Sequence, residues 1–435
     1  MKTDTIYAPS SAIGGAIAVI RISGERAREA ATLFDRDILS RPRELVRTRA
    51  SRGGEQIDDC MAVWFPAPRS YTGEDMMEIN CHGGAQTVQK LFGALASLGF
   101  RPAEGGEFTK RAFLNDKMDL SQAEAVMDVV TADAEQSLKA ALLQLEGSVS
   151  RAVGAIEDRL LDALSGIDAA IDYPDEAKAE ATEALPEELE KALLDIRALI
   201  QDGRRGRVLR DGLRVLILGR PNVGKSSLMN ALLGAERAIV TAAAGTTRDV
   251  LDEKLSVEGV PLRLIDTAGI RQAENEAERI GVDRARAQLK TADVVCVVLD
   301  QSEALQPEDE ALLHETAGLC RIVLYNKCDL PKRISCGAAG LCVSAKTGEG
   351  LAAWKKAILA LAAPERADQS LITNERHIRA LELAEAALVQ AGAANGLDLA
   401  ATDIREALHA LGAITGSDVD ADVIDRIFSR FCVGK

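Results

Sequence analysis

Residues 219–226, with the sequence GRPNVGKS, place the strongest constraint on what this chain can fold into. They have the GxxxxGK[ST] spacing of a phosphate-binding loop, in which glycines let backbone N–H groups turn toward phosphate oxygens. The apolar run 213–218 predicts a buried strand before the loop, and 227–233 predicts the start of a helix after it. In this setting Lys225 would reach the outer phosphates, and the Ser226 hydroxyl would ligate Mg²⁺.

Two downstream motifs have the order and spacing of elements that respond to a γ-phosphate. Residues 245–249 (GTTRD) read as a switch segment, in which we choose Thr247 to complete the Mg²⁺ shell. Residues 266–269 (DTAG) follow a predicted strand. Asp266 would hold Mg²⁺ through water, and the Gly269 N–H would contact the γ-phosphate.

A third and a fourth motif predict how the base is recognised. In residues 326–329 (NKCD), Asp329 can accept two hydrogen bonds from guanine, whereas adenine offers no such pair of donors. Residues 344–346 (SAK) would close over the guanine carbonyl with a backbone N–H. The sequence therefore predicts binding and hydrolysis of GTP, with Mg²⁺, and excludes ATP.

The residue after the DTAG motif points to an unusual catalytic arrangement. Ras-like enzymes place a glutamine there to orient the attacking water, but this chain has Ile270. No arginine finger is evident in the switch segment, although such a cation contributes roughly 10³–10⁵ in rate. We therefore expect another cation and another water-orienting group.

Composition limits the other functions that the chain can have. Its net charge of −15 excludes a general nucleic-acid or membrane binder. Two arginine clusters, at 41–52 and 204–210, could contact a polyanion, although we favour a solvated face for both. The eight cysteines have no CxxC spacing, and no signal peptide or membrane-spanning run is evident, so we expect a cytoplasmic location.

The chain reads as a sequence of distinct segments. Residues 1–118 predict an α+β domain, with strands at 17–22, 60–65 and 76–81 and a helix at about 25–34. Residues 119–211 and 369–435 have helical patterns, the first resuming near Pro186 after a break at 173–174. We expect one helical domain built from both halves, with an α/β domain at 212–368 inserted between them. Two separate small bundles are the alternative.

Motifs outside the nucleotide-binding segment carry a resemblance to a known family. The stretches RISG, SYTGED, CHGG, GEFTKRAFLNDKMDLSQAEA and FCVGK, together with GRPNVGKSSLMNALL, AGTTRD, DTAGIR and ERIG, resemble the bacterial MnmE (TrmE) tRNA-modification GTPases. The resemblance spans essentially the whole chain. Cys328 stands where many relatives have a small residue, and we expect it to contact neither base nor phosphate.

The resemblance implies a fold, a reaction and partners. It implies an α/β P-loop GTPase domain inserted into an α-helical domain, preceded by an α+β domain that binds tetrahydrofolate and forms a homodimer. The family works with an FAD-containing partner, MnmG (GidA), in a heterotetramer or larger complex. Together they add a carboxymethylaminomethyl or aminomethyl group to carbon 5 of the wobble uridine of certain tRNAs. A formyl- or methylene-tetrahydrofolate would supply the one-carbon unit.

The resemblance also implies roles for particular residues. Glu278 would orient the attacking water indirectly, and Cys432 would face the folate, although a free thiol on a frayed tail is the alternative. The folate would contact Arg21, Glu78, Lys117 and Lys435. Potassium would be held by Asn222, Thr241, Ala243 and Thr246. With the motif residues, the expected GTP site comprises Asn222, Val223, Gly224, Lys225, Ser226, Ser227, Thr241, Thr246, Thr247, Asp266, Thr267, Ala268, Gly269, Asn326, Lys327, Asp329, Ser344, Ala345 and Lys346.

Two other classes of protein remain open at this point. A ribosome-assembly GTPase would bind RNA without modifying it, but the sequence has no KH-type GXXG module and no strongly basic domain. A G-domain regulator of a membrane transporter is disfavoured by the lack of a spanning segment. Binding of a reduced folate to the N-terminal domain would separate the family interpretation from both.

Overall fold

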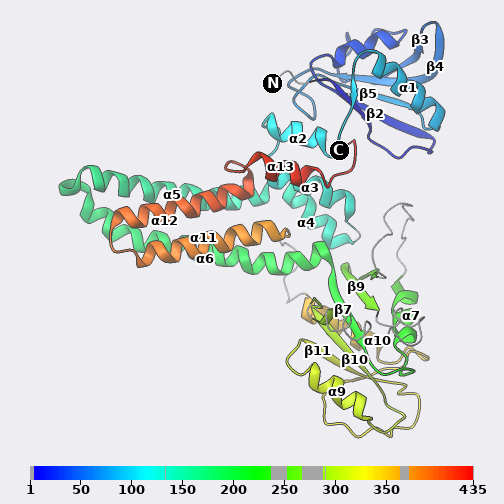
Figure 1. Ribbon diagram of the computed structural model, residues 1–435, viewed down its shortest axis with the longest axis vertical. Coiled ribbons are helices and arrows are strands. Elements are labelled where there is room, and N and C mark those ends of the chain that lie inside the picture. Colours follow the sequence, from blue (N-terminus) through cyan, green and yellow to red (C-terminus); the bar gives the residue numbers. More distant parts are fainter. Residues whose placement is uncertain are drawn as a thin grey trace. The chain divides into compact units, whose positions relative to one another are not determined.

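The computed structural model describes residues 4–132, 134–236, 252–266, 288–289, 291–362 and 372–434. The chain divides into two compact units. The first holds Met1–Met127, Leu145–Asp162 and Ala401–Lys435, and the second holds Asp128–Gln144 and Ala163–Ala400. The colours of Figure 1 follow the elements of both units along the chain. The first unit is therefore assembled from stretches that are far apart in sequence.

The first unit contains a six-stranded sheet with the order β3-β4-β5-β2-β1-β6. The predicted strands at 17–22, 60–65 and 76–81 are confirmed. Helix α1 (Ala85–Ser97) and the short 3-10 helix η1 (Ala27–Leu33) share an apolar core with this sheet. The strands are β1 (Ile6–Pro9), β2 (Ile17–Ser23), β3 (Val46–Arg52), β4 (Glu55–Phe65), β5 (Met76–His82) and β6 (Arg101–Pro102).

One local expectation for this unit was wrong, and one strand was not predicted. The helix expected at about 25–34 is only the 3-10 segment η1. It ends at Leu33 because the next residue, Phe34, has an extended backbone and forms a β-bridge with Ala50. The arginine cluster at 41–52 contains an edge strand, β3. This strand was not predicted, because its charged residues obscure the apolar pattern of a strand. In that strand Thr48 and Ala50 are buried while Arg47 and Arg49 are exposed, which is the two-residue alternation of a strand with one covered face.

Helices from both ends of the chain share a second core in the first unit. Helices α2 (Glu107–Leu114) and α3 (Leu120–Thr131) contribute Phe113, Leu120 and Ala123, and α13 (Ala421–Phe428) contributes Phe428. The rings of Phe428 and Phe431 lie 5.2 Å apart. The unit also takes the first part of α5 (Ser148–Asp172) and most of α12 (Leu397–Thr415). The C-terminal residues thus pack with helices α2 and α3.

The second unit begins with helices that lead into a second sheet. The break expected at 173–174 is confirmed, because α5 ends at Asp172 and α6 (Pro174–Asp211) begins at Pro174. The helix does not resume near Pro186 as expected, but runs through it. Helix α6 packs along α11 (Glu375–Ala393), and helix α4 (Glu135–Leu145) contacts the end of α6, where Ser137 Oγ donates to the Leu209 carbonyl.

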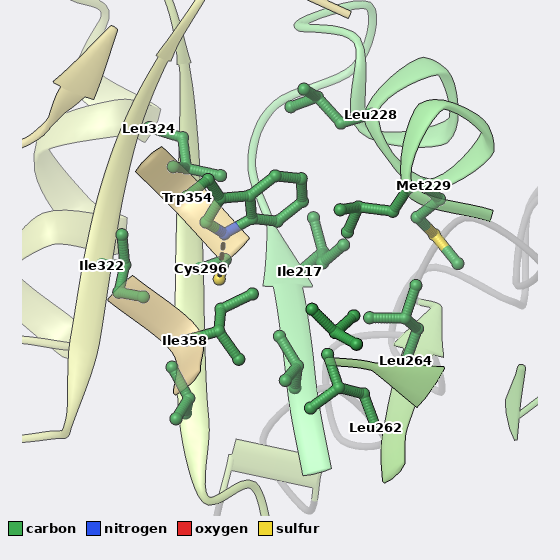
Figure 2. Packing of buried hydrophobic residues seen from close by; sticks show 14 of the residues in the cluster. Ile217, Leu228, Met229, Leu262, Leu264, Cys296, Ile322, Leu324, Trp354 and Ile358 are labelled. Carbon is green, nitrogen blue, oxygen red and sulfur yellow. Dashed lines mark hydrogen bonds between the residues drawn. The ribbon is translucent and has the colours of Figure 1, made fainter. Parts of the chain in front are cut away.

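The second sheet has the order β12-β11-β10-β7-β9-β8, with β8 antiparallel to β9 and the other pairs parallel. Apolar cores cover both faces, which explains the continuous apolar sequence of β10. Figure 2 shows one core, where the indole of Trp354 donates to the Cys296 sulfur over 3.3 Å. The elements are β7 (Leu213–Leu218), α7 (Lys225–Glu236), β8 (Asp252–Val257), β9 (Val260–Asp266), β10 (Val294–Asp300), α9 (Pro307–Glu315), β11 (Arg321–Asn326), β12 (Leu341–Cys342) and α10 (Leu351–Ala362).

Candidate functional site

The phosphate-binding loop lies between β7 and α7, as its sequence predicts. Gly224 has a φ of 97°, and a Cβ there would lie 2.2 Å from Asn326 Nδ2, so only glycine fits. Asn222 also has a left-handed backbone, with a φ of 66°, which asparagine tolerates better than most residues. The loop therefore bends sharply where the motif requires, with the Asn222 side chain exposed.

Polar groups gather at the N-terminus of α7. The Lys225 ammonium donates to the carbonyls of Gly219 and Arg220, each over 2.7 Å, and so lies across the loop. Ser226 and Ser227 are exposed in the first turn. The backbone N–H groups of a helix's first turn and the helix dipole favour an anion at this end, and a hydroxyl oxygen is a suitable Mg²⁺ ligand. The residues present therefore fit a magnesium-bound polyphosphate.

Asn326 joins the phosphate loop to the loops that would read the base. It is buried at the end of β11, where its Nδ2 donates to the Val223 carbonyl over 2.7 Å. Its Oδ1 accepts from the backbone N–H of Ala345 over 3.2 Å. One side chain thus fixes the distance between the phosphate loop and the SAK loop, with Lys346 exposed beside it.

The carboxylate predicted to recognise guanine is already oriented. Ser344 is fully buried, and its Oγ donates to Asp329 Oδ1 over 2.7 Å, while the Asp329 residue itself is exposed. Lys327, whose φ is 63°, donates to Asp300 over 2.5 Å. Burial opposes ionisation of Asp300, but hydrogen bonds from Lys327 and Ser302 overcome it and lower its pKa. The Lys327–Asp300 ion pair thus fastens the NKCD loop to the end of β10, and Asp329 is exposed to solvent.

Several expected site residues lie outside the described part of the chain. Asp266 ends β9, beside the phosphate loop strand β7, and the placement of its side chain is not described. The expected site residues that lie wholly outside that part are Thr241, Ala243, Thr246, Thr247, Thr267, Ala268, Gly269, Ile270, Glu278 and Lys435.

A second polar site lies in the first unit. Arg21 of β2 and Glu78 of β5 are cross-strand partners, and Arg21 Nε donates to Glu78 Oε1 over 2.9 Å. The guanidinium lies 5.1 Å from the centre of the Tyr71 ring and 5.8 Å from that of Phe108. Lys117 is exposed and donates to the carbonyl of Pro68, in the loop that carries Tyr71. Sequence reasoning missed both aromatic residues, although Tyr71 belongs to the SYTGED stretch.

The C-terminal tail is held against the first domain. Val433 bridges Gly105, and the Cys432 carbonyl accepts from the Gly106 N–H over 3.2 Å. Gly434 has a φ of 95°, and a Cβ there would lie 1.9 Å from the Pro9 carbonyl oxygen. The Cys432 side chain is exposed on this fixed tail. The tail is therefore part of the first unit rather than a frayed end.

The strand, loop and helix around Lys225, with the NKCD loop after the parallel strand β11 of the same sheet, define the P-loop GTPase class. Two family profiles match the chain: the MnmE helical domain over residues 120–432, and the GTP-binding protein TrmE N-terminus over 5–117. The chain therefore belongs to the MnmE family. The expected fold class is confirmed, and the P-loop domain lies within the segment that matches the helical-domain profile.

Full-length relatives are similar along their whole length. The tRNA modification GTPase MnmE of Lactiplantibacillus plantarum is 42% identical, with 99% of this chain and 98% of the relative covered. That of Shouchella clausii is 42% identical with both chains covered completely. Among solved structures, the G domain of the T. maritima FeoB iron transporter matches 35% of this chain and 99% of its own, at 28% identity and a TM-score of 0.26. In the described residues, no helix is long and apolar enough to span a membrane.

Proposed function

We propose that this protein is a GTP-hydrolysing tRNA modification enzyme. It acts with an FAD-dependent partner of the MnmG type, adding a carboxymethylaminomethyl or aminomethyl group at carbon 5 of the wobble uridine of certain tRNAs. The observation that carries the proposal is the 42% identity to a tRNA modification GTPase over 99% of the chain. The paired Arg21 and Glu78, which a simple GTPase does not need, support a second substrate site.

The proposed GTP site uses the residues named from the sequence. Asp329, oriented by Ser344, selects guanine, and Asn326 holds the base loop and the phosphate loop in register. Lys225 neutralises phosphate charge, and the exposed Ser226 hydroxyl is free to ligate Mg²⁺. Bound Mg²⁺ and K⁺ would stabilise the negative charge that develops between the β- and γ-phosphates. Among the proposed potassium ligands, Asn222 has an exposed side-chain oxygen on the phosphate loop.

The proposed folate site uses the polar cluster of the first unit. A pteridine ring needs a carboxylate acceptor, which Glu78 supplies, and an aromatic neighbour such as Tyr71 to stack upon. Arg21 would hold the Glu78 carboxylate in place for the ring, and Lys117 would supply a cation for the glutamyl tail. Because the tail residues 432–434 pack on the same domain, Lys435 and Cys432 are the proposed C-terminal contributors. A reduced folate there would supply the one-carbon unit, and the partner's flavin would supply the redox chemistry.

The proposed organisation follows the family. Residues 1–118 form the folate-binding and dimerisation domain, 119–211 and 369–435 the two halves of the helical domain, and 212–368 the GTPase domain. The protein acts in the cytoplasm as a homodimer within a heterotetramer or larger complex with its flavin partner and tRNA.

A test that depends on chemistry rather than on similarity is nucleoside analysis of tRNA. A bacterial strain that lacks its own MnmE is complemented with this protein or with its Lys225→Ala variant. Mass spectrometry of the wobble uridine should show the C5 modification restored by the wild type and absent with the variant, because the phosphate loop has lost its cation. Equal modification levels in both strains, with both proteins present at equal abundance, would refute the proposed role of GTP.

A further inference from the structure

Arg220, the second residue of the phosphate-binding loop, points away from the loop toward helix α9. Its Nε lies 3.0 Å from each carboxylate oxygen of Asp309, and its Nη2 lies 2.9 Å from Glu303 Oε2. The Asp309 side chain is 2% exposed and that of Arg220 is 16% exposed. A pair this well shielded from water is far less screened than an ordinary surface ion pair.

Asp309 is also held in place by its own helix, independently of Arg220. It lies in the first turn of α9, where its Oδ2 also accepts from the backbone N–H of Gln306 over 3.1 Å. A carboxylate at a helix N-terminus is stabilised by the free N–H groups and by the helix dipole. Asp309 therefore gives the phosphate loop a rigid point of attachment.

The backbone of Arg220 is held by a second contact, with Lys225. Its carbonyl accepts from the Lys225 ammonium over 2.7 Å, while its side chain is fastened to Asp309. The position of residue 220 thus helps to set both the course of the loop and the position of the lysine that would meet the phosphates.

The segment between β10 and α9 also reaches the base-reading loop. Asp300, at its start, binds Lys327, and the N–H of Gln301 donates to the Asn326 carbonyl over 2.9 Å. Asp309, at its far end, binds Arg220. One stretch of ten residues therefore supports both halves of the nucleotide site.

We propose that Arg220 is a positioning residue that holds the phosphate loop in its binding conformation through Asp309. The inference rests on the proposed GTP site and names a determinant of nucleotide affinity outside the set of contact residues. Without the guanidinium, Asp309 would be a buried carboxylate with no cation, and the loop would lose its attachment to α9. Nucleotide affinity should fall, because binding would then include the free-energy cost of ordering the loop.

The experiment compares GDP binding by the full-length protein and three variants, using calorimetry, with melting temperatures recorded in parallel. Arg220→Met should weaken GDP binding at least about tenfold, a cost of roughly 1.4 kcal/mol. Arg220→Lys keeps the charge but not the two-pronged geometry and should show a smaller loss, of about three- to tenfold. Discrimination between GDP and ADP should stay unchanged, because Asp329 is untouched.

Arg321→Met is the matched control. Arg321 also fastens α9, at its other end, where Nη1 donates to the Leu313 carbonyl and to Thr316 Oγ1, and it lies outside the loops of the nucleotide site. The Arg321→Met variant should have a lower melting temperature but an unchanged GDP affinity. If Arg220→Lys binds GDP as the wild type does, or if the control weakens binding equally, the inference is wrong. Failure of the wild type to bind any guanine nucleotide would instead overturn the proposed function.

Discussion

The amide of Asn326 donates to the carbonyl of Val223 over 2.7 Å, so the first residue of the base-reading motif is bonded to the middle of the phosphate loop. The two residues are 103 positions apart in sequence. A nucleotide has a fixed distance between base and phosphate, and this bond sets the matching distance in the protein. Recognition of the base and binding of the phosphates are therefore properties of one connected structure.

Guanine selectivity should depend on Asp329. The Asp329→Asn variant presents a donor where guanine needs an acceptor, and should shift preference from GTP toward xanthosine triphosphate. Competition binding with both nucleotides measures the shift. The fold should be unaffected, because Asp329 is exposed and its partner Ser344 can also donate to the asparagine oxygen. Unchanged GTP affinity in the variant would exclude Asp329 from base recognition.

Binding of a reduced folate should depend on Arg21 and Glu78. Arg21→Ala should lower the affinity for formyl-tetrahydrofolate at least about tenfold, because it removes a charge-assisted hydrogen bond. Arg26 provides a matched control in the same domain, since it pairs with Glu29 and lies over the Phe100 ring at 5.8 Å. Arg26→Ala should leave calorimetric folate binding unchanged. Absence of binding to the full-length wild type, with Lys435 present, would disprove the folate site.

GTP hydrolysis should depend on potassium. Replacing potassium with sodium, at saturating GTP, should lower the rate at least about tenfold, because the smaller ion fits the proposed oxygen ligands poorly. Asn222→Ala should remove the difference between the two ions. Asn230→Ala, which changes an exposed asparagine further along α7, should preserve it. Equal rates of the wild type in both salts would mean that another group supplies the missing positive charge.

Glu278 should be needed for turnover and not for binding. Glu278→Ala should abolish measurable GTP hydrolysis while the affinity for GTP stays within about twofold, because the side chain acts on the attacking water. Single-turnover hydrolysis and equilibrium binding together check this. A parallel loss of affinity and rate would point to a structural role instead.

Stability in acid should depend on the ion pairs around Arg111 in the first unit. This buried guanidinium donates to Glu74 over 3.0 Å and to Glu107 over 3.0 Å, and Arg101 donates to Glu107 over 2.6 Å. Burial acts to raise the pKa of Glu107, but these arginines and the Glu104 N–H hold it below its ordinary value of 4.5. A carboxylate with a lowered pKa in the folded state stabilises that state above its ordinary pKa, and the effect is lost as the pH falls.

Arg111→Met should therefore lower the free energy of unfolding by about 3–5 kcal/mol at pH 7, because it removes the arginine that binds the partly buried Glu74 and leaves Glu107 with Arg101. The difference from the wild type should shrink as the pH falls below about 4.5, the ordinary pKa of Glu107, because the stability that comes from its lowered pKa is lost there. Arg47→Met, which breaks the exposed pair with Asp59, should leave the free energy of unfolding nearly unchanged at either pH, because water screens that pair. Denaturant titrations that give the same Arg111→Met difference at both pH values would contradict this account.

Elements with strong local patterns were predictable from the sequence. Strand β7 follows from the apolar run 213–218, and the break before α6 follows from Pro174; both signals act within a few residues. Strand β3 was missed because its exposed positions carry arginine, and only pairing with β4 reveals the alternation.

The candidate sites were predictable only as far as motifs name their residues. Tyr71 over Arg21, and Asp309 beside Arg220, join residues 50 and 89 positions apart, so no local pattern contains them. The anchoring of the tail at Gly105 depends likewise on a bridge across most of the chain. Sequence motifs identify the groups that touch a ligand, whereas the groups that position them depend on the fold.

If GTP binding at this site drives uridine modification, a reconstituted reaction should require the nucleotide that the site recognises. The protein is mixed with its flavin partner, a reduced folate, an amine donor (ammonium or glycine), potassium and tRNA, and C5-modified wobble uridine is measured by mass spectrometry. The wild type should form the modified nucleoside with GTP and not with xanthosine triphosphate. The Asp329→Asn variant should form it with xanthosine triphosphate and poorly with GTP. Modification that proceeds equally without either nucleotide would contradict the claim.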